Sequence, residues 1–299
     1  MTYVAATAHS FPNEGEFRLF PLVAHQMGDT ADAEASIWLS EATGWATSRR
    51  RQIAAAIDYV TPILLENQIP LIWTKGTALA ATVYPSPNLR PSGDLDGLLH
   101  WDHLPRLAAL AEKLGWTSYL GQQGPAAGHR YRGSELSWKL PGGIALDVGW
   151  MPRRTFAFDP FVIEYVVANA RRAPDQLAVA DTTWLFIEAI EHGLSANPVW
   201  PIRWVVDALR LIEISGAQID WEFIVDIAQR YKMQSLMLLG LETLSAFTNE
   251  IPDMVIAALS RHQPTRLERD ELSARLNLAT VKDNFLVVQR YNVVQRAPL

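Results

Sequence analysis

Apolar positions along this chain repeat with two different periods, and the change of period marks its elements. Residues 49–68 repeat with helical spacing, and residues 31–45 favour an earlier helix. Short apolar runs at 71–74 and from Asp94 onward favour strands, with a helix at 78–84 between them. This part of the chain therefore predicts two helices followed by a strand, a helix and a second strand.

Farther along, a hairpin and then a series of helices are expected. Spaced leucines predict a helix at 102–114, and the turn Pro141-Gly142-Gly143 joins predicted strands at 135–140 and 144–150. Another strand is expected at 117–120, and residues 284–294 favour either a late strand or an irregular segment. Later helices are predicted at 160–172, 182–194, 201–214, 220–231 and 233–247.

These elements predict three parts. Residues 1–48 form a helical N-terminal segment, residues 49–155 a core of strands and helices, and residues 156–299 a helical half with a C-terminal tail. The core contains the chemically distinctive residues, so we expect the functional site there.

Composition narrows the class of protein. The chain has 299 residues, a net charge of −6 and no cysteine. Disulfides, thiolate metal sites and a cysteine nucleophile are therefore excluded, and no global basic field would hold a polynucleotide. No apolar run reaches membrane-spanning length and no signal-peptide pattern is visible. We expect a soluble cytoplasmic protein without a membrane partner.

Three aspartates form the main candidate for chemistry. Asp94 and Asp96 are two positions apart on a predicted strand, so their carboxylates share one face, about 6.6 Å apart along the chain. Asp147 is an isolated acid on another apolar strand and needs a partner. A shared Mg²⁺ ion would relieve the repulsion among these oxygens. The alternative interpretation is a solvated strand edge.

A second candidate is the turn Lys75-Gly76-Thr77 between a strand and a helix. Glycine allows close approach of a ligand, and free amides at a helix N-terminus favour phosphate. Lys75 adds a mobile positive charge. Arg90, just before the acidic pair, would bind a phosphate or brace Asp94.

Other charged residues have plainer interpretations. Arg49-Arg50-Arg51 reads as a solvated helix start, and Arg203 with Asp207 as a structural i,i+4 ion pair.

These motifs, in this order, resemble the uncharacterised nucleotidyltransferase family of the polymerase-β-like superfamily. The residues that carry the resemblance are Lys75-Gly76-Thr77-Ala78-Leu79, Tyr84-Pro85, Leu89-Arg90-Pro91, Gly93-Asp94-Leu95-Asp96, Leu146-Asp147-Val148, the helix with His192, Arg203-Trp204-Val205-Val206-Asp207 and Asp220-Trp221-Glu222. The chain departs from the family pattern at Asp147 and Gly149, where relatives often carry Glu and His.

The resemblance implies an α+β fold, with a small mixed β-sheet core, helices on one side and a mainly helical C-terminal domain that covers the cleft. It implies Mg²⁺-dependent transfer of a nucleoside monophosphate from a nucleoside triphosphate such as ATP to a hydroxyl acceptor, with a two-ion site. Asp94, Asp96 and Asp147 would be catalytic and hold the metal. Lys75, Gly76, Thr77 and Arg90 would bind the triphosphate.

Two rival hypotheses remain at this stage. A catalytically silent nucleotide- or partner-binding module could retain the fold. Transfer onto RNA, rather than onto a small molecule, would need a basic cleft wall near Arg130 and Arg132.

Overall fold

The structure is a computed structural model that describes residues 18–28, 33–118, 135–150, 159–173, 177–194 and 202–276. The late strand or irregular segment expected at 284–294, the end of the strand predicted at 117–120, and Arg130 and Arg132 lie outside these residues.

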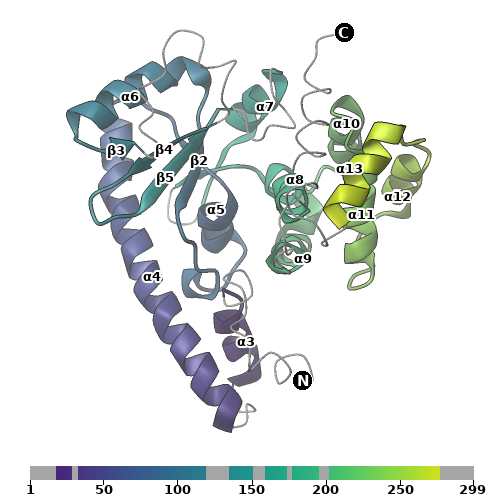
Figure 1. The fold of residues 1–299 in the computed structure, drawn as a ribbon, viewed down its shortest axis with the longest axis horizontal. Coiled ribbons are helices and arrows are strands. Elements are labelled where there is room, and N and C mark those ends of the chain that lie inside the picture. The colour runs from purple at the N-terminus through teal and green to yellow at the C-terminus, as the bar shows by residue number, and fades with distance from the viewer. Residues whose placement is uncertain are drawn as a thin grey trace.

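A seven-stranded mixed sheet forms the centre of the core (Figure 1). Its strands are β1 Ile72–Trp73, β2 Leu95–Leu98, β3 Thr117–Ser118, β4 Glu135–Lys139, β5 Ala145–Gly149, β6 Arg171–Arg172 and β7 Ala178–Val179. Their order is β3-β4-β5-β2-β1-β7-β6. The pairs β2–β5 and β1–β7 are parallel, and the other pairs are antiparallel. The predicted mixed sheet is confirmed.

The helices pack against this sheet and continue beyond it (Figure 1). The α-helices are α3 Phe20–Met27, α4 Ala33–Glu66, α5 Lys75–Thr82, α6 Leu104–Lys113, α7 Phe161–Asn169, α8 Thr182–Gly193, α9 Arg203–Ser215, α10 Trp221–Arg230, α11 Gln234–Ser245, α12 Asp253–Ser260 and α13 Arg266–Leu276. Short 3₁₀ turns are η2 Pro87–Leu89, η3 Trp101–His103 and η7 Gly216–Gln218. Helices α12 and α13 were not predicted from the sequence.

The helix α4 is one continuous helix of 34 residues and not two. Its second half packs Ile53, Val60 and Leu64 into the core, at the spacing that the sequence predicts. The arginines at 49–51 therefore lie in mid-helix and do not form a solvated helix start. Arg49 is half-buried and donates to the backbone carbonyls of Ser92 and Gly93, so α4 holds the loop that leads into β2.

One face of β5 is buried and the other is half-exposed. Leu146 and Val148 are fully buried, whereas Asp147 between them is only partly covered. This alternation fits a sheet that is covered by helices on one side, with its polar side chains on the other face.

The core and the helical half share one continuous hydrophobic cluster. The strands β6 and β7 come from residues after 155 and join the sheet beside β1, so the sheet draws on both parts of the chain. Helices α8 to α13 gather to the right of α5 in Figure 1. Among the described residues, no helix is long and apolar enough to cross a bilayer.

Close packing of α8 against α9 depends on Gly193. A Cβ atom added there would lie 2.0 Å from Cγ of the buried Trp204. We expect Gly193→Ala to lower the free energy of unfolding by about 1–3 kcal/mol, because overpacking forces the helices apart. Urea denaturation measures this change.

The matched control is Gly216→Ala. Gly216 has helical backbone angles, and a Cβ atom there would lie 3.9 Å from its nearest neighbour, on Ile212. This variant should be neutral or slightly stabilising. Equal losses in both variants would contradict the packing argument.

Candidate active site

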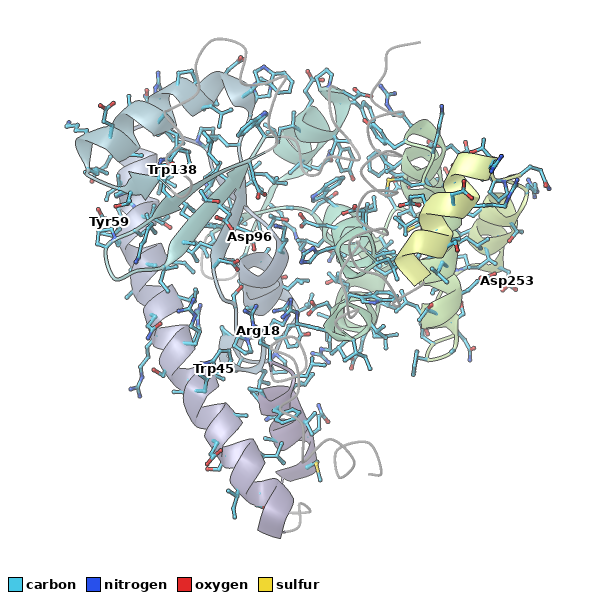
Figure 2. All side chains as sticks on the ribbon, in the orientation of Figure 1. Arg18, Trp45, Tyr59, Asp96, Trp138 and Asp253 are labelled. Carbon is cyan, nitrogen blue, oxygen red and sulfur yellow. The ribbon has the colours of Figure 1, made fainter. Side chains whose placement is uncertain are left out.

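The parallel pairing of β2 with β5 brings two acids together. Asp96 and Asp147 are register partners, and partners on neighbouring strands point to the same face, about 4.8 Å apart at the backbone. Asp94 lies directly before β2 and two residues before Asp96, so it belongs to the same face. Figure 2 shows Asp96 on the sheet beside α5. We call these three aspartates the acid face.

The charges on the acid face act on one another. Burial raises the pKa of Asp94, and the charges of Asp96 and Asp147 raise it further, whereas Lys75 and Arg18 lower it. Burial also raises the pKa of Asp147; a hydrogen bond from Ser137 opposes this shift, and Asp96 adds to it. The three carboxylates are therefore close enough for mutual repulsion.

Lys75 supplies the positive charge that this face lacks. Its Nζ lies 2.5 Å from Oδ1 of Asp96. The backbone of Lys75 has a φ of 44°, in the left-handed region that residues other than glycine rarely adopt. Backbone strain of this kind costs about 1–3 kcal/mol and occurs often at functional sites. The turn from β1 into α5 thus places the ammonium of Lys75 against the acid face.

Gly76 allows this turn to lie close to the loop before β2. A Cβ atom at Gly76 would lie 2.4 Å from Oγ of Ser92, so a larger residue would require the side chain of Ser92 to move. The next residue, Thr77, is buried, and its hydroxyl has no hydrogen-bond partner among the described residues. The predicted contact between this hydroxyl and a phosphate is therefore not available without movement of the turn.

A buried carboxylate on α8 anchors the turn between β1 and α5. Glu188 is 3% exposed. It accepts a hydrogen bond from the hydroxyl of Thr74 and one of 3.3 Å from the backbone N–H of Lys75. The sequence contains a signal for this role, because an acid within an apolar helix needs a partner.

Arg90 forms a buried ion pair with Asp207. Its Nε and Nη2 donate to the two carboxylate oxygens of Asp207 at 2.6 and 2.7 Å, and the hydroxyl of Tyr84 donates to the same carboxylate at 2.7 Å. Arg90 is 5% exposed. Nη1 of Arg90 donates to the backbone carbonyl of Pro91 at 3.3 Å. Binding of a phosphate by Arg90, or bracing of Asp94, stays a prediction, and either role would require these contacts to rearrange.

The same contacts correct the expectation that Arg203 and Asp207 form an ion pair. Asp207 is paired with Arg90, across the boundary between the core and the helical half, and not with Arg203 on its own helix. Although burial lowers the pKa of Arg90, the charge of Asp207 raises it. A bidentate arginine–carboxylate pair of this kind fixes both distance and orientation.

Two further arginines surround the loop that leads into Asp94, and sequence reasoning missed both. Arg49 binds this loop through the carbonyl of Gly93. Nη2 of Arg18 lies 2.7 Å from where a Cβ atom of Gly93 would stand, and Figure 2 shows Arg18 beside α3 and below Asp96. No sequence pattern identifies Arg18. Arg49 lies one helical turn before the buried Ile53, so the apolar spacing of α4 is a signal that could have identified it.

The donor set of the acid face suits a hard divalent cation. Carboxylate oxygens are the ligands that Mg²⁺ prefers, and a cation would relieve the repulsion among the three acids. Among the described residues, no three His, Cys, Asp or Glu side chains stand close enough to hold a metal as they are. Lys75 is the cation at Asp96, so an ion shared by all three acids requires Lys75 to move aside.

Comparison with known proteins agrees with the sequence motifs. The model of an uncharacterised nucleotidyltransferase family matches residues 16–249. The chain is similar to the crystal structure of an antigenic nucleotidyltransferase-like protein from Paracoccidioides brasiliensis, with 17% identity and a TM-score of 0.38, over 55% of this chain and 76% of that one. A similarity this low says nothing about the site. No curated protein matches the chain.

The Arg90–Asp207 pair gives a prediction for stability. Asp207→Ala should lower the free energy of unfolding by about 3–5 kcal/mol, because it leaves the buried guanidinium of Arg90 without its carboxylate. Replacement of both residues, as Arg90→Met with Asp207→Leu, should restore most of this loss. Urea denaturation of the single and double variants measures both effects.

Glu213→Ala is the matched control on the same helix. Glu213 is exposed and pairs with Arg210 at the surface, so its loss should cost about 0–1 kcal/mol. A cost for Asp207→Ala no larger than for Glu213→Ala would show that the buried pair does not join the two parts.

Asp94 gives a prediction for pH dependence. Since its pKa is higher in the folded than in the unfolded protein, ionisation favours unfolding as pH rises from the ordinary carboxyl pKa through the raised one. Asp94→Asn should remove this loss, so the metal-free variant should gain stability over the natural protein as pH rises through that window. Thermal unfolding between acid and neutral pH measures the difference. A constant difference across this range would contradict the prediction.

Proposed function

Because the chain belongs to the uncharacterised nucleotidyltransferase family, we propose that it transfers a nucleoside monophosphate from a nucleoside triphosphate to a hydroxyl group of a small molecule. The observation that carries this proposal is the acid face beside the strained turn at Lys75. Carboxylates that hold a cation, placed beside a helix N-terminus that binds phosphate, are suited to the transfer of a nucleotidyl group.

In the proposed reaction, the oxygen of the acceptor hydroxyl forms a bond to the α-phosphorus. The bond from this phosphorus to the bridging oxygen of pyrophosphate breaks, and pyrophosphate leaves. Asp147 accepts the proton of the hydroxyl, a role that its raised pKa supports. When bound, Mg²⁺ would be held by Asp94, Asp96 and Asp147, and would neutralise the developing negative charge.

The turn at the start of α5 serves the leaving group. The ammonium of Lys75, once released from Asp96, offsets charge that builds up on pyrophosphate. Gly76 keeps the backbone open to close approach, since it has no side chain to fill the space near Ser92. Glu188 holds Lys75 and Thr74 in place, which makes it a positioning residue.

One observation favours a second candidate function. The contact of 2.5 Å between Lys75 and Asp96 already neutralises an acid that the metal would need, and no three-ligand group is preformed in the described part of the chain. A catalytically silent nucleotide-binding module, in which Lys75 permanently replaces the cation, has this arrangement. Such a protein would bind triphosphate without Mg²⁺ and release no pyrophosphate.

Asp96→Asn tests the proposal. We expect it to lower Mg²⁺-dependent release of pyrophosphate by more than about a hundredfold, because it removes the carboxylate shared by Lys75 and the proposed metal. The assay incubates labelled triphosphates with a cell extract as the acceptor source and follows the labelled product and pyrophosphate. Addition of Mg²⁺ should also raise the melting temperature of the natural protein but not of the variant.

Asp102→Asn is the control. Asp102 is an acid with a 71% exposed side chain on η3, outside the strands β2 and β5, and its removal should leave turnover unchanged. Full turnover by Asp96→Asn would disprove the catalytic assignment. Nucleotide binding without Mg²⁺ and without turnover in the natural protein would favour the silent module.

A further inference from the structure

Within the described residues, Arg203 of the helical half has no hydrogen-bonded or ion-paired carboxylate. Arg203 is the first residue of α9 and is half-buried. The carboxylate one turn along the helix, Asp207, is occupied by Arg90 and Tyr84. Arg203 makes no hydrogen bond or ion pair with any residue in the described part of the chain.

The surroundings of Arg203 include charges from both parts of the molecule. Burial lowers its pKa to about 10, the positive charges of Arg90 and Arg18 also lower it, and Asp207 and Asp94 oppose the shift. The guanidinium is still fully charged at neutral pH. Arg203 is therefore near enough to Asp94 for the two charges to interact, although they come from different parts of the chain.

The arginines near Arg203 flank the two glycine-containing segments of the site. Nη1 of Arg90 lies 3.6 Å from where a Cβ atom of Gly76 would stand, and Arg18 covers the same position at Gly93. Gly76 belongs to the first turn of α5, and Gly93 directly precedes Asp94. Asp207, one turn along α9 from Arg203, binds Arg90. The first turn of α9 therefore lies where the helical half meets the α5 turn and the loop of the acid face.

A half-buried cation beside two other cations is unfavourable for folding alone. An anion bound between the α5 turn and α9 would offset this cost. Guanidinium binds phosphate oxygens with two parallel hydrogen bonds, which makes arginine well suited to this anion. Arg90 donates to Asp207, and the other arginine of α9, Arg210, donates to the carbonyl of Val83 and to Glu213. Arg203 is therefore the arginine of α9 with donors to offer.

We propose that Arg203 contacts a phosphate of the nucleoside triphosphate, and of the pyrophosphate product, at the α5 turn. This inference rests on the proposed function, because it assigns a residue to the same site. It makes Arg203 the direct contribution of the helical half to substrate binding, and it replaces the structural role that its spacing to Asp207 suggests.

Binding of inorganic pyrophosphate tests this assignment. Isothermal titration calorimetry, with and without Mg²⁺, compares the natural protein with Arg203→Gln, Arg203→Lys and Arg106→Gln. We expect Arg203→Gln to bind pyrophosphate about tenfold more weakly or worse, and Arg203→Lys to keep part of the affinity through its charge. Arg106 is exposed on α6, so Arg106→Gln should change affinity by less than about twofold.

Melting temperature separates binding from a structural role. Without ligand, Arg203→Gln should melt at the same or a higher temperature than the natural protein, because it removes an uncompensated buried charge. With pyrophosphate, the natural protein should gain more thermal stability than this variant.

The outcomes distinguish this inference from the proposed function. Equal pyrophosphate binding by Arg203→Gln and the natural protein would overturn the inference and leave the nucleotidyltransferase proposal intact. A lower melting temperature of the ligand-free variant would also overturn it, in favour of a structural arginine. Absence of pyrophosphate binding by the natural protein, with Mg²⁺ present, would count against both.

Discussion

The register between β2 and β5 is the constraint on which the site depends. Parallel pairing sets Asp96 directly beside Asp147, and a shift by one residue would turn one of the two carboxylates to the apolar face. Leu95 and Leu146, also register partners, are fully buried on that apolar face. The hydrophobic core therefore fixes the register, and the register in turn forces like charges together.

Forced proximity of these acids requires compensating positive charge, and the surrounding elements supply it. Lys75 comes from the turn after β1 and Arg18 from the segment before α3, and Arg49 on α4 binds the carbonyl of Gly93 beside Asp94. Buried polar contacts then connect the core to the helical half, through Glu188 on α8 and Asp207 on α9. The acid face is thus held by elements from both parts of the described chain.

Local sequence patterns predicted the strands of the acid face well, because alternation of apolar and polar residues directly records which side of a strand is buried. Asp147 between Leu146 and Val148 is the clearest case. Patterns at helical spacing also located α8 to α11. The continuity of α4 was missed because the predicted helices at 31–45 and 49–68 are joined by Ala46-Thr47-Ser48, which has no apolar pattern of its own. The first half of α4 packs against α3, a tertiary contact that the sequence does not record.

The sequence did not predict which ionic partners the charged residues would have. Spacing suggested Arg203 for Asp207, yet Arg90 binds it from 117 positions away, and only the folded chain brings these two together. Arg18 and Glu188 entered the site in the same way, through tertiary contacts. Side-chain periodicity reports burial, whereas the choice of an ionic partner depends on distances that no local pattern contains.

Asp94 differs from its two neighbours in how its backbone is anchored. Asp96 and Asp147 lie within paired strands, but Asp94 precedes β2 and is positioned by the side chain of Arg49 on the adjacent carbonyl. In the proposed metal site, two ligands of the cation would then be rigid and the third adjustable. Ions of different radius, such as Mg²⁺ and the larger Mn²⁺, would be accommodated by displacement of this single carboxylate, so tolerance for cation size would be controlled from α4 rather than from the sheet.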